Sequence, residues 1–128
     1  MDTRTLAEDP DEFAPDGAEV RFLARTSKAS MAEFRLPPGM VAHAVRHRTV
    51  DEVWFVQSGR GQLWRMAADR SATVNLAPGV SISIEVGTSF QFRNVGDESL
   101  SIIATTTPLW PGDDEVELVR GLWEPSSA

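Results

Sequence analysis

The chain has 128 residues, no cysteine and a formal net charge of −7 at pH 7. This length fits one domain with its own core. The lack of cysteine excludes disulfides, thiolate zinc sites and cysteine nucleophiles. The acidic balance argues against nucleic acid and anionic membranes as partners. The N-terminal segment lacks the apolar core of a signal peptide, so we expect a cytoplasmic protein without a membrane partner.

The predicted elements are an acidic arm followed by many short strands. Residues 1–17 combine acidic residues with Pro and Gly and predict a flexible arm. From residue 18 to residue 124, apolar segments with strand periodicity alternate with Gly and Pro turn signals. The expected strands are residues 20–24, 31–36, 41–45, 52–56, 62–66, 72–76, 81–86, 89–95, 100–107 and 116–119. No segment keeps a helical period, which predicts an all-β barrel or a two-sheet sandwich.

Two blocks with regular spacing stand out within these strands. In the first block, Gly39 is followed by five residues, then by Val45, one residue and His47. Four residues separate His47 from Glu52, and six more separate Glu52 from Gly59.

The second block begins about twenty residues later. Gly79 is followed by five residues and Glu85, with Gly87 two positions beyond. Two residues separate Gly87 from Phe90, and three more separate Phe90 from Asn94.

The order and spacing of the two blocks resemble the signature of the cupin superfamily, small β-barrels of the jelly-roll type. The segment PLWPGDDE, residues 108–115, is similar to small single-domain cupins loosely described as mannose-6-phosphate-isomerase-like. The resemblance implies a cupin jelly-roll barrel and a site where three histidines and one glutamate hold a metal. His47 and Glu52 match two of these positions, whereas Val45 and Phe90 replace histidines and Glu85 replaces a proline.

The ligand set implied by this resemblance is incomplete. Two protein ligands are too few for tight binding of Zn, Fe or Mn, so we expect no metal cofactor. The alternative is one divalent transition metal held by His43, His47 and Glu52. In a regular strand His43 and His47 would share a face but lie about 13 Å apart. A bend at residues 44–45 could bring them together, so this alternative stays open.

The inward-facing positions predict a mostly apolar pocket with a polar corner. Its expected ligand-binding residues are Val45, Trp54, Val56, Phe90 and Phe92. The alternative is that these side chains simply fill the barrel.

The polar corner consists of His47 and Glu52, the candidate catalytic residues. They would form either an acid/base pair, each stabilising the charged form of the other, or a structural remnant of a metal site.

The sequence thus predicts a small cupin that binds a small, partly apolar organic molecule, as a homodimer. The alternative is a metal-dependent cupin isomerase or dioxygenase. A deoxysugar epimerase of the cupin type pairs a histidine with a tyrosine, and this chain has no tyrosine. A fourth possibility is an interaction module, in which Trp110 and Trp123 are exposed for docking; alternatively, they cover a barrel end or a dimer partner.

Overall fold

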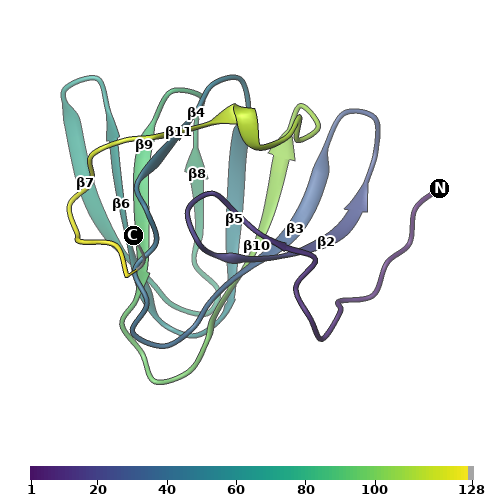
Figure 1. Cartoon of the computed structure of the whole chain (residues 1–128), viewed down its shortest axis with the longest axis horizontal. Coiled ribbons are helices and arrows are strands. Elements are labelled where there is room, and N and C mark those ends of the chain that lie inside the picture. Colours follow the sequence, from purple (N-terminus) through teal and green to yellow (C-terminus); the bar gives the residue numbers. More distant parts are fainter. Residues whose placement is uncertain (127–128) are drawn as a thin grey trace.

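Two antiparallel β-sheets pack face to face in the computed structural model, which describes residues 1–126 (Figure 1). The strands of the first sheet are β1 (Glu12–Phe13), β2 (Glu19–Arg25), β3 (Ser30–Leu36), β5 (Asp51–Ser58), β8 (Ser81–Ile84) and β10 (Leu100–Thr107). Those of the second are β4 (Val45–His47), β6 (Gly61–Ala67), β7 (Arg70–Leu76), β9 (Ser89–Asn94) and β11 (Val116–Leu118). The first sheet has the order β1-β2-β3-β10-β5-β8 and the second β11-β4-β9-β6-β7, so the predicted all-β jelly roll is confirmed. Between residues 1 and 126, no helix is long and apolar enough to cross a membrane.

The core between the sheets follows from the alternation of side chains along each strand. In β5, Glu52, Trp54 and Val56 are buried, whereas Val53 and Phe55 between them are exposed. Successive side chains of a strand point to opposite faces, so each sheet presents one apolar face to the other. This inward face carries the residues of the candidate site.

Gly59 closes β5 at a point where no larger residue fits. Its φ of 86° lies in the left-handed region, which costs other residues energy. A Cβ atom there would lie 2.7 Å from Cα of Leu100 at the start of β10. The glycine of the first block therefore allows β10 to pass close to the end of β5.

The strand predicted for residues 41–45 is wrong. Val41 forms only an isolated bridge with Arg93, and β4 begins at Val45. The backbone N–H of His43 donates to the carbonyl of Asp16 in the arm at 2.9 Å, instead of joining a ladder. Residues 43–47 are thus not one regular strand, and β1, a short strand in the arm, was not predicted.

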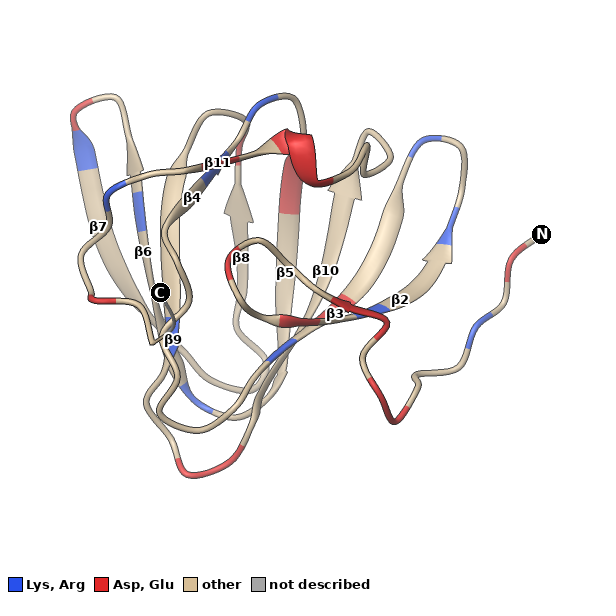
Figure 2. Cartoon of the chain, viewed as in Figure 1, with Lys and Arg blue, Asp and Glu red and all other residues tan. Residues whose placement is uncertain are grey.

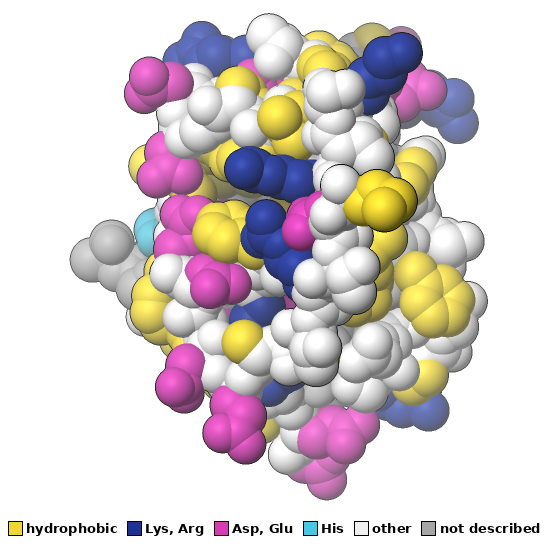
Figure 3. Space-filling view, turned by 90° about the vertical axis from the view of Figure 1, so that its right-hand side faces the viewer, with side chains coloured by type: hydrophobic (Ala, Val, Ile, Leu, Met, Phe, Trp, Pro, Cys, Tyr) yellow, Lys and Arg dark blue, Asp and Glu magenta, His cyan; other side chains and the backbone are white. Residues whose placement is uncertain are grey.

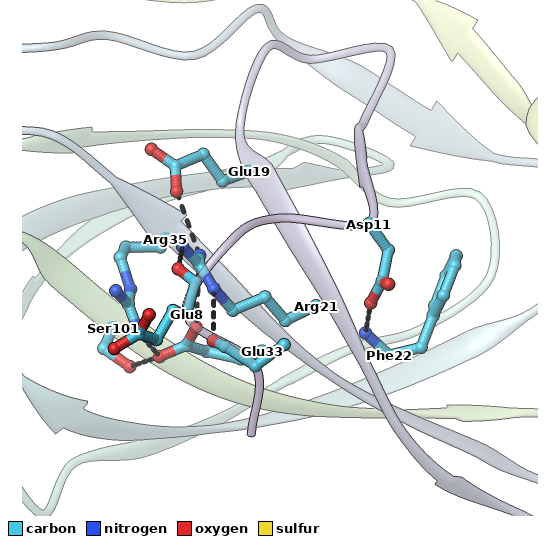
Figure 4. Close-up of polar contacts among 9 residues, drawn as sticks. Glu8, Asp11, Glu19, Arg21, Phe22, Glu33, Arg35 and Ser101 are labelled. Atoms are coloured by element: carbon cyan, nitrogen blue, oxygen red, sulfur yellow. Dashed lines mark hydrogen bonds and ion pairs between the residues drawn. The ribbon is translucent and has the colours of Figure 1, made fainter. Parts of the chain in front are cut away.

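Part of the acidic arm, at residues 7–8, is held by Arg21 of β2 beside Glu33 of β3 (Figure 4). Arg21, only 3% exposed, donates to the carbonyls of Ala7 at 3.0 Å and Glu8 at 2.7 Å. Its guanidinium also lies 3.5 Å from the fully buried Glu33, which accepts a hydrogen bond from Arg35 at 2.8 Å. A buried carboxylate is costly unless paired, so this network stabilises Glu33 and holds the arm. On the side of the molecule where β2 and β3 lie, basic side chains gather between acidic ones (Figure 3). The flexibility predicted for residues 1–17 stays a prediction.

Candidate functional site

A cavity of about 370 Å³ lies on the inward face of the first sheet, where the arm and the segment before β11 cover it. Its lining comes from the arm, from β2, β3, β4, β5, β9 and β10, and from residues 109–116. Figure 2 marks in red the acidic residues of the 3₁₀ helix η1 (Asp113–Glu115), of the start of β5 and of the arm; the cavity lining includes one or more from each, namely Glu12, Asp16, Glu52 and Asp113. Segments distant in sequence thus enclose one mostly apolar space.

Four of the predicted site residues meet at this cavity, namely Val45, His47, Glu52 and Phe90. Val45 of β4 and Phe90 of β9 are register partners, so the two apolar replacements lie directly beside each other.

The other three predicted ligand-binding residues lie in the core and are not part of the cavity lining. Trp54, Val56 and Phe92 are buried, and the rings of Trp54 and Phe92 pack edge to face at 5.2 Å. Of these three, Trp54 reaches the polar corner, because its indole N–H donates to Glu52.

Glu52 is a buried carboxyl with neutral hydrogen-bond donors. It is 3% exposed, and it accepts from the indole N–H of Trp54 at 2.7 Å and from the hydroxyl of Thr106 at 3.2 Å. Burial raises the pKa of Glu52 to about 7, although both hydrogen bonds act to lower it, while the nearby Asp16 adds to the rise. Glu52 can therefore gain or lose a proton near neutral pH.

His47 is 5% exposed and lies among aromatic rings. The rings of Phe90 and Trp110 pack edge to face with its imidazole, with ring centroids 5.2 and 5.4 Å away. Its Nε2 lies 4.0 Å from Oε2 of Glu52, beyond a hydrogen bond, and Nδ1 has no hydrogen-bond partner within the described part of the chain. Burial lowers the pKa of His47, opposed by the charge of Glu115. Burial thus favours the neutral forms of both His47 and Glu52, rather than the expected mutual stabilisation of charge.

Glu115, which sequence reasoning missed, supports the site from η1. It is buried and accepts hydrogen bonds from the backbone N–H groups of Thr49 at 2.6 Å and Val50 at 2.8 Å. Burial acts to raise its pKa, but these bonds and the Thr49 hydroxyl hold the pKa below its usual value. Glu115 therefore stays ionised, ties η1 to the turn before β5, and places one negative charge near His47.

Two further residues at the cavity come from segments that the motif does not include. Asp16 of the arm accepts from the backbone N–H of Ala18 at 3.0 Å, and burial raises its pKa to about 6, opposed by that bond and by the nearby His43. Trp110, considered for docking or for covering a barrel end, is partly buried against His47. The Gly beside Asp16 indicates only a turn, so no local pattern predicts that Asp16 lines a cavity.

Comparison with known proteins identifies the architecture. Residues 32–106, more than half of the chain, match the family model of the cupin domain. The chain belongs to the cupin family. No curated protein matches this cupin.

Solved structures with the same fold share little sequence with this cupin. Oxalate decarboxylase from Bacillus subtilis, a protein with Mn(II) centres, is 20% identical with a TM-score of 0.68; the match covers 79% of this chain and 28% of that chain. The capsular polysaccharide assembling protein CapF from Staphylococcus aureus is 17% identical with a TM-score of 0.75; the match covers 93% of this chain and 35% of that chain. BH2720 from Bacillus halodurans is 21% identical with a TM-score of 0.64; the match covers 70% of this chain and 69% of that chain. The chain spans about a third or less of the first two proteins, and these likenesses show the fold.

The residues at the family's metal position do not fit a resident metal. Apolar side chains, Val45 and Phe90, stand where two histidines would be needed. His43 is not part of the cavity lining, and the described residues contain no group of three His, Cys, Asp or Glu side chains placed to hold an ion. His43 is therefore not grouped with His47 and Glu52 among the described residues.

Proposed function

We propose that this cupin binds a small, partly apolar organic molecule in the cavity, through the polar corner of His47 and Glu52. The proposal rests on one observation: a mostly apolar space of about 370 Å³ meets two buried ionisable side chains, His47 and Glu52, neither of which pairs with an Arg or Lys of the described residues. Small-molecule sites are typically concave and apolar, with a few convergent polar groups. A cavity of this size leaves room for a ligand, whereas a barrel filled by its own side chains would not.

The polar corner has the chemistry to orient a ligand. Neutral His47 offers one ring nitrogen as an acceptor, and protonated Glu52 offers a hydroxyl donor. Since Glu52 titrates near neutral pH, the same pair could move a proton on a bound substrate. Binding is the function proposed, and proton transfer is the reaction that the pair would support.

A metal-dependent enzyme remains the second candidate, because a structural neighbour has Mn(II) centres. The argument against this second candidate is that His47 and Glu52 are its only two protein ligands at the family's metal position. Elemental analysis of the purified protein separates the two candidates: a stoichiometric transition metal would favour the enzyme, and a metal-free protein that binds organic fragments would favour the proposal.

The binding proposal is tested by filling the cavity. Ala32 of β3 lines it, so Ala32→Phe would place a ring in the space that the ligand needs. We expect aromatic fragments, titrated by NMR, to shift the resonances of His47, Phe90 and Trp110 in the natural protein, and Ala32→Phe to abolish these shifts. Ala72→Phe, the same change at an exposed position of β7, is the matched control. Fragment shifts that persist in a folded Ala32→Phe protein would contradict the proposal.

The predicted homodimer and cytoplasmic location stay predictions. Analytical ultracentrifugation gives the oligomeric state directly.

A further inference from the structure

The carboxyl groups at the cavity lack the cationic partners that buried carboxyls usually have. Across residues 1–126, no Lys or Arg forms an ion pair with Glu52 or Asp16; Glu52 has only His47 at 4.0 Å, and Asp16 has His43 nearby. The contrast with Glu33 is direct, since Arg21 and Arg35 both pair with that buried carboxylate. The chain thus compensates a buried carboxylate on its outer face but leaves two carboxyls at the cavity without an Arg or Lys.

The other charged groups at the cavity do not supply the missing positive charge to its interior. Arg4 and Arg25 line it but are exposed, and the guanidinium of Arg4 pairs with Asp2 at 3.1 Å. Glu12 and Asp113 add two more carboxylates to the lining, and Glu115 lies near His47. An anionic ligand would therefore meet carboxylates in the interior and find basic groups only at the exposed edge.

Aromatic rings form much of the remaining wall. Phe22, Phe34, Phe90 and Trp110 all line the cavity, and Phe90 and Trp110 meet at His47. The face of an aromatic ring attracts a cation, most strongly where water is excluded. Aromatic rings and carboxyls without an Arg or Lys partner favour the same sign of charge.

From this arrangement we infer that the ligand of the cavity is an organic cation, an ammonium group on an apolar body. The ammonium group lies beside Glu52 and Asp16, and the apolar body packs against Phe90 and Trp110. Such a ligand supplies the positive charge that the chain does not, and each charge stabilises the other in a site of low polarity. This inference rests on the proposed function, because it names the ligand class of the same cavity.

Three probes with one aromatic body and different charges test the inference. The purified full-length chain is titrated at neutral pH with 2-naphthylmethylamine, 2-naphthalenemethanol and 2-naphthoate, by calorimetry and by NMR. We expect the amine to bind at least tenfold more tightly than the alcohol or the naphthoate, a difference of about 1.4 kcal/mol. Glu52→Gln and Asp16→Asn should each weaken the amine severalfold or more and leave the alcohol within twofold. Glu85→Gln, which changes an exposed carboxyl outside the cavity lining, should change neither.

The outcomes separate this inference from the proposed function. Equal or tighter binding of the alcohol or the naphthoate would overturn the cationic ligand and leave the cavity as a binding site. Unchanged amine affinity in both folded carboxyl variants would also overturn it. If none of the three probes binds, both the inference and the proposed function are wrong.

Discussion

Replacing Glu52 by Gln should change how the stability of the protein depends on pH. Gln has nearly the same shape and keeps an acceptor for the indole N–H of Trp54, but it carries no charge. The pKa of Glu52 rises from 4.5 to about 7 on folding, so the folded state binds the proton more tightly than the unfolded state. For a carboxyl with a raised pKa, the free energy of unfolding is therefore unaffected below pH 4.5, falls between pH 4.5 and 7, and stays lower above pH 7.

The magnitude follows from the size of the shift. Each pKa unit corresponds to about 1.4 kcal/mol, so the shift from 4.5 to about 7 predicts a loss of about 3 kcal/mol at pH 8. The group is almost completely buried, so solvent screens this effect little. The Gln variant lacks this loss, so its stability relative to the natural protein should rise by about 3 kcal/mol between pH 4.5 and 8.

Urea denaturation at several pH values measures the difference. Both proteins contain Asp16 and His47, so their own titrations largely cancel in the comparison. Glu85→Gln controls for loss of a carboxyl at an exposed position, and its difference from the natural protein should stay flat. Parallel stability profiles for the natural protein and Glu52→Gln would refute the assignment of Glu52 as a buried, uncompensated carboxyl.

Two further predictions concern the arm and His47. Arg21→Met should lower the free energy of unfolding by about 2 kcal/mol, because it removes the more buried of the two cations beside Glu33 together with the hydrogen bonds to the arm, and should make residues 1–16 sensitive to limited proteolysis. Arg35→Met, which removes a more exposed partner of Glu33, should cost less and leave the arm protected; equal effects of the two changes would contradict the role of Arg21. His47 should titrate below its ordinary value of 6.5 by NMR, and Glu115→Gln should lower its pKa further, because the charge of Glu115 supports the imidazolium. A His47 pKa at or above 6.5, or one that Glu115→Gln leaves unchanged, would refute this account of the site.

The strands were predictable because their signal is local. Five consecutive residues of β5 show the alternation of buried and exposed side chains, and Gly59 follows the end of the strand. The segment around His43 was predicted wrongly because its backbone pairs with Asp16 of the arm, a contact that no local pattern reports.

The site was predictable only where the motif includes its residues. The spacing identified His47, Glu52, Val45 and Phe90, and all four line the cavity. Strand alternation gives the face on which a side chain lies but not its depth in the barrel, so it could not show that Trp54 is buried outside the cavity lining.

The residues that sequence reasoning missed lie far from the motif in the chain. Asp16, Trp110 and Glu115 reach the site through the fold, from the arm and from the segment before β11. Their role depends on long-range packing, which a single sequence does not report.

A crystal structure of the protein with saturating 2-naphthylmethylamine would test the central claim most directly. We predict the naphthyl ring within the cavity against Phe90 and Trp110, with the ammonium group at hydrogen-bonding distance from Glu52 or Asp16. A probe bound elsewhere on the surface, or a cavity closed by its own side chains at saturating probe, would contradict the claim that this cupin binds its ligand between the sheets.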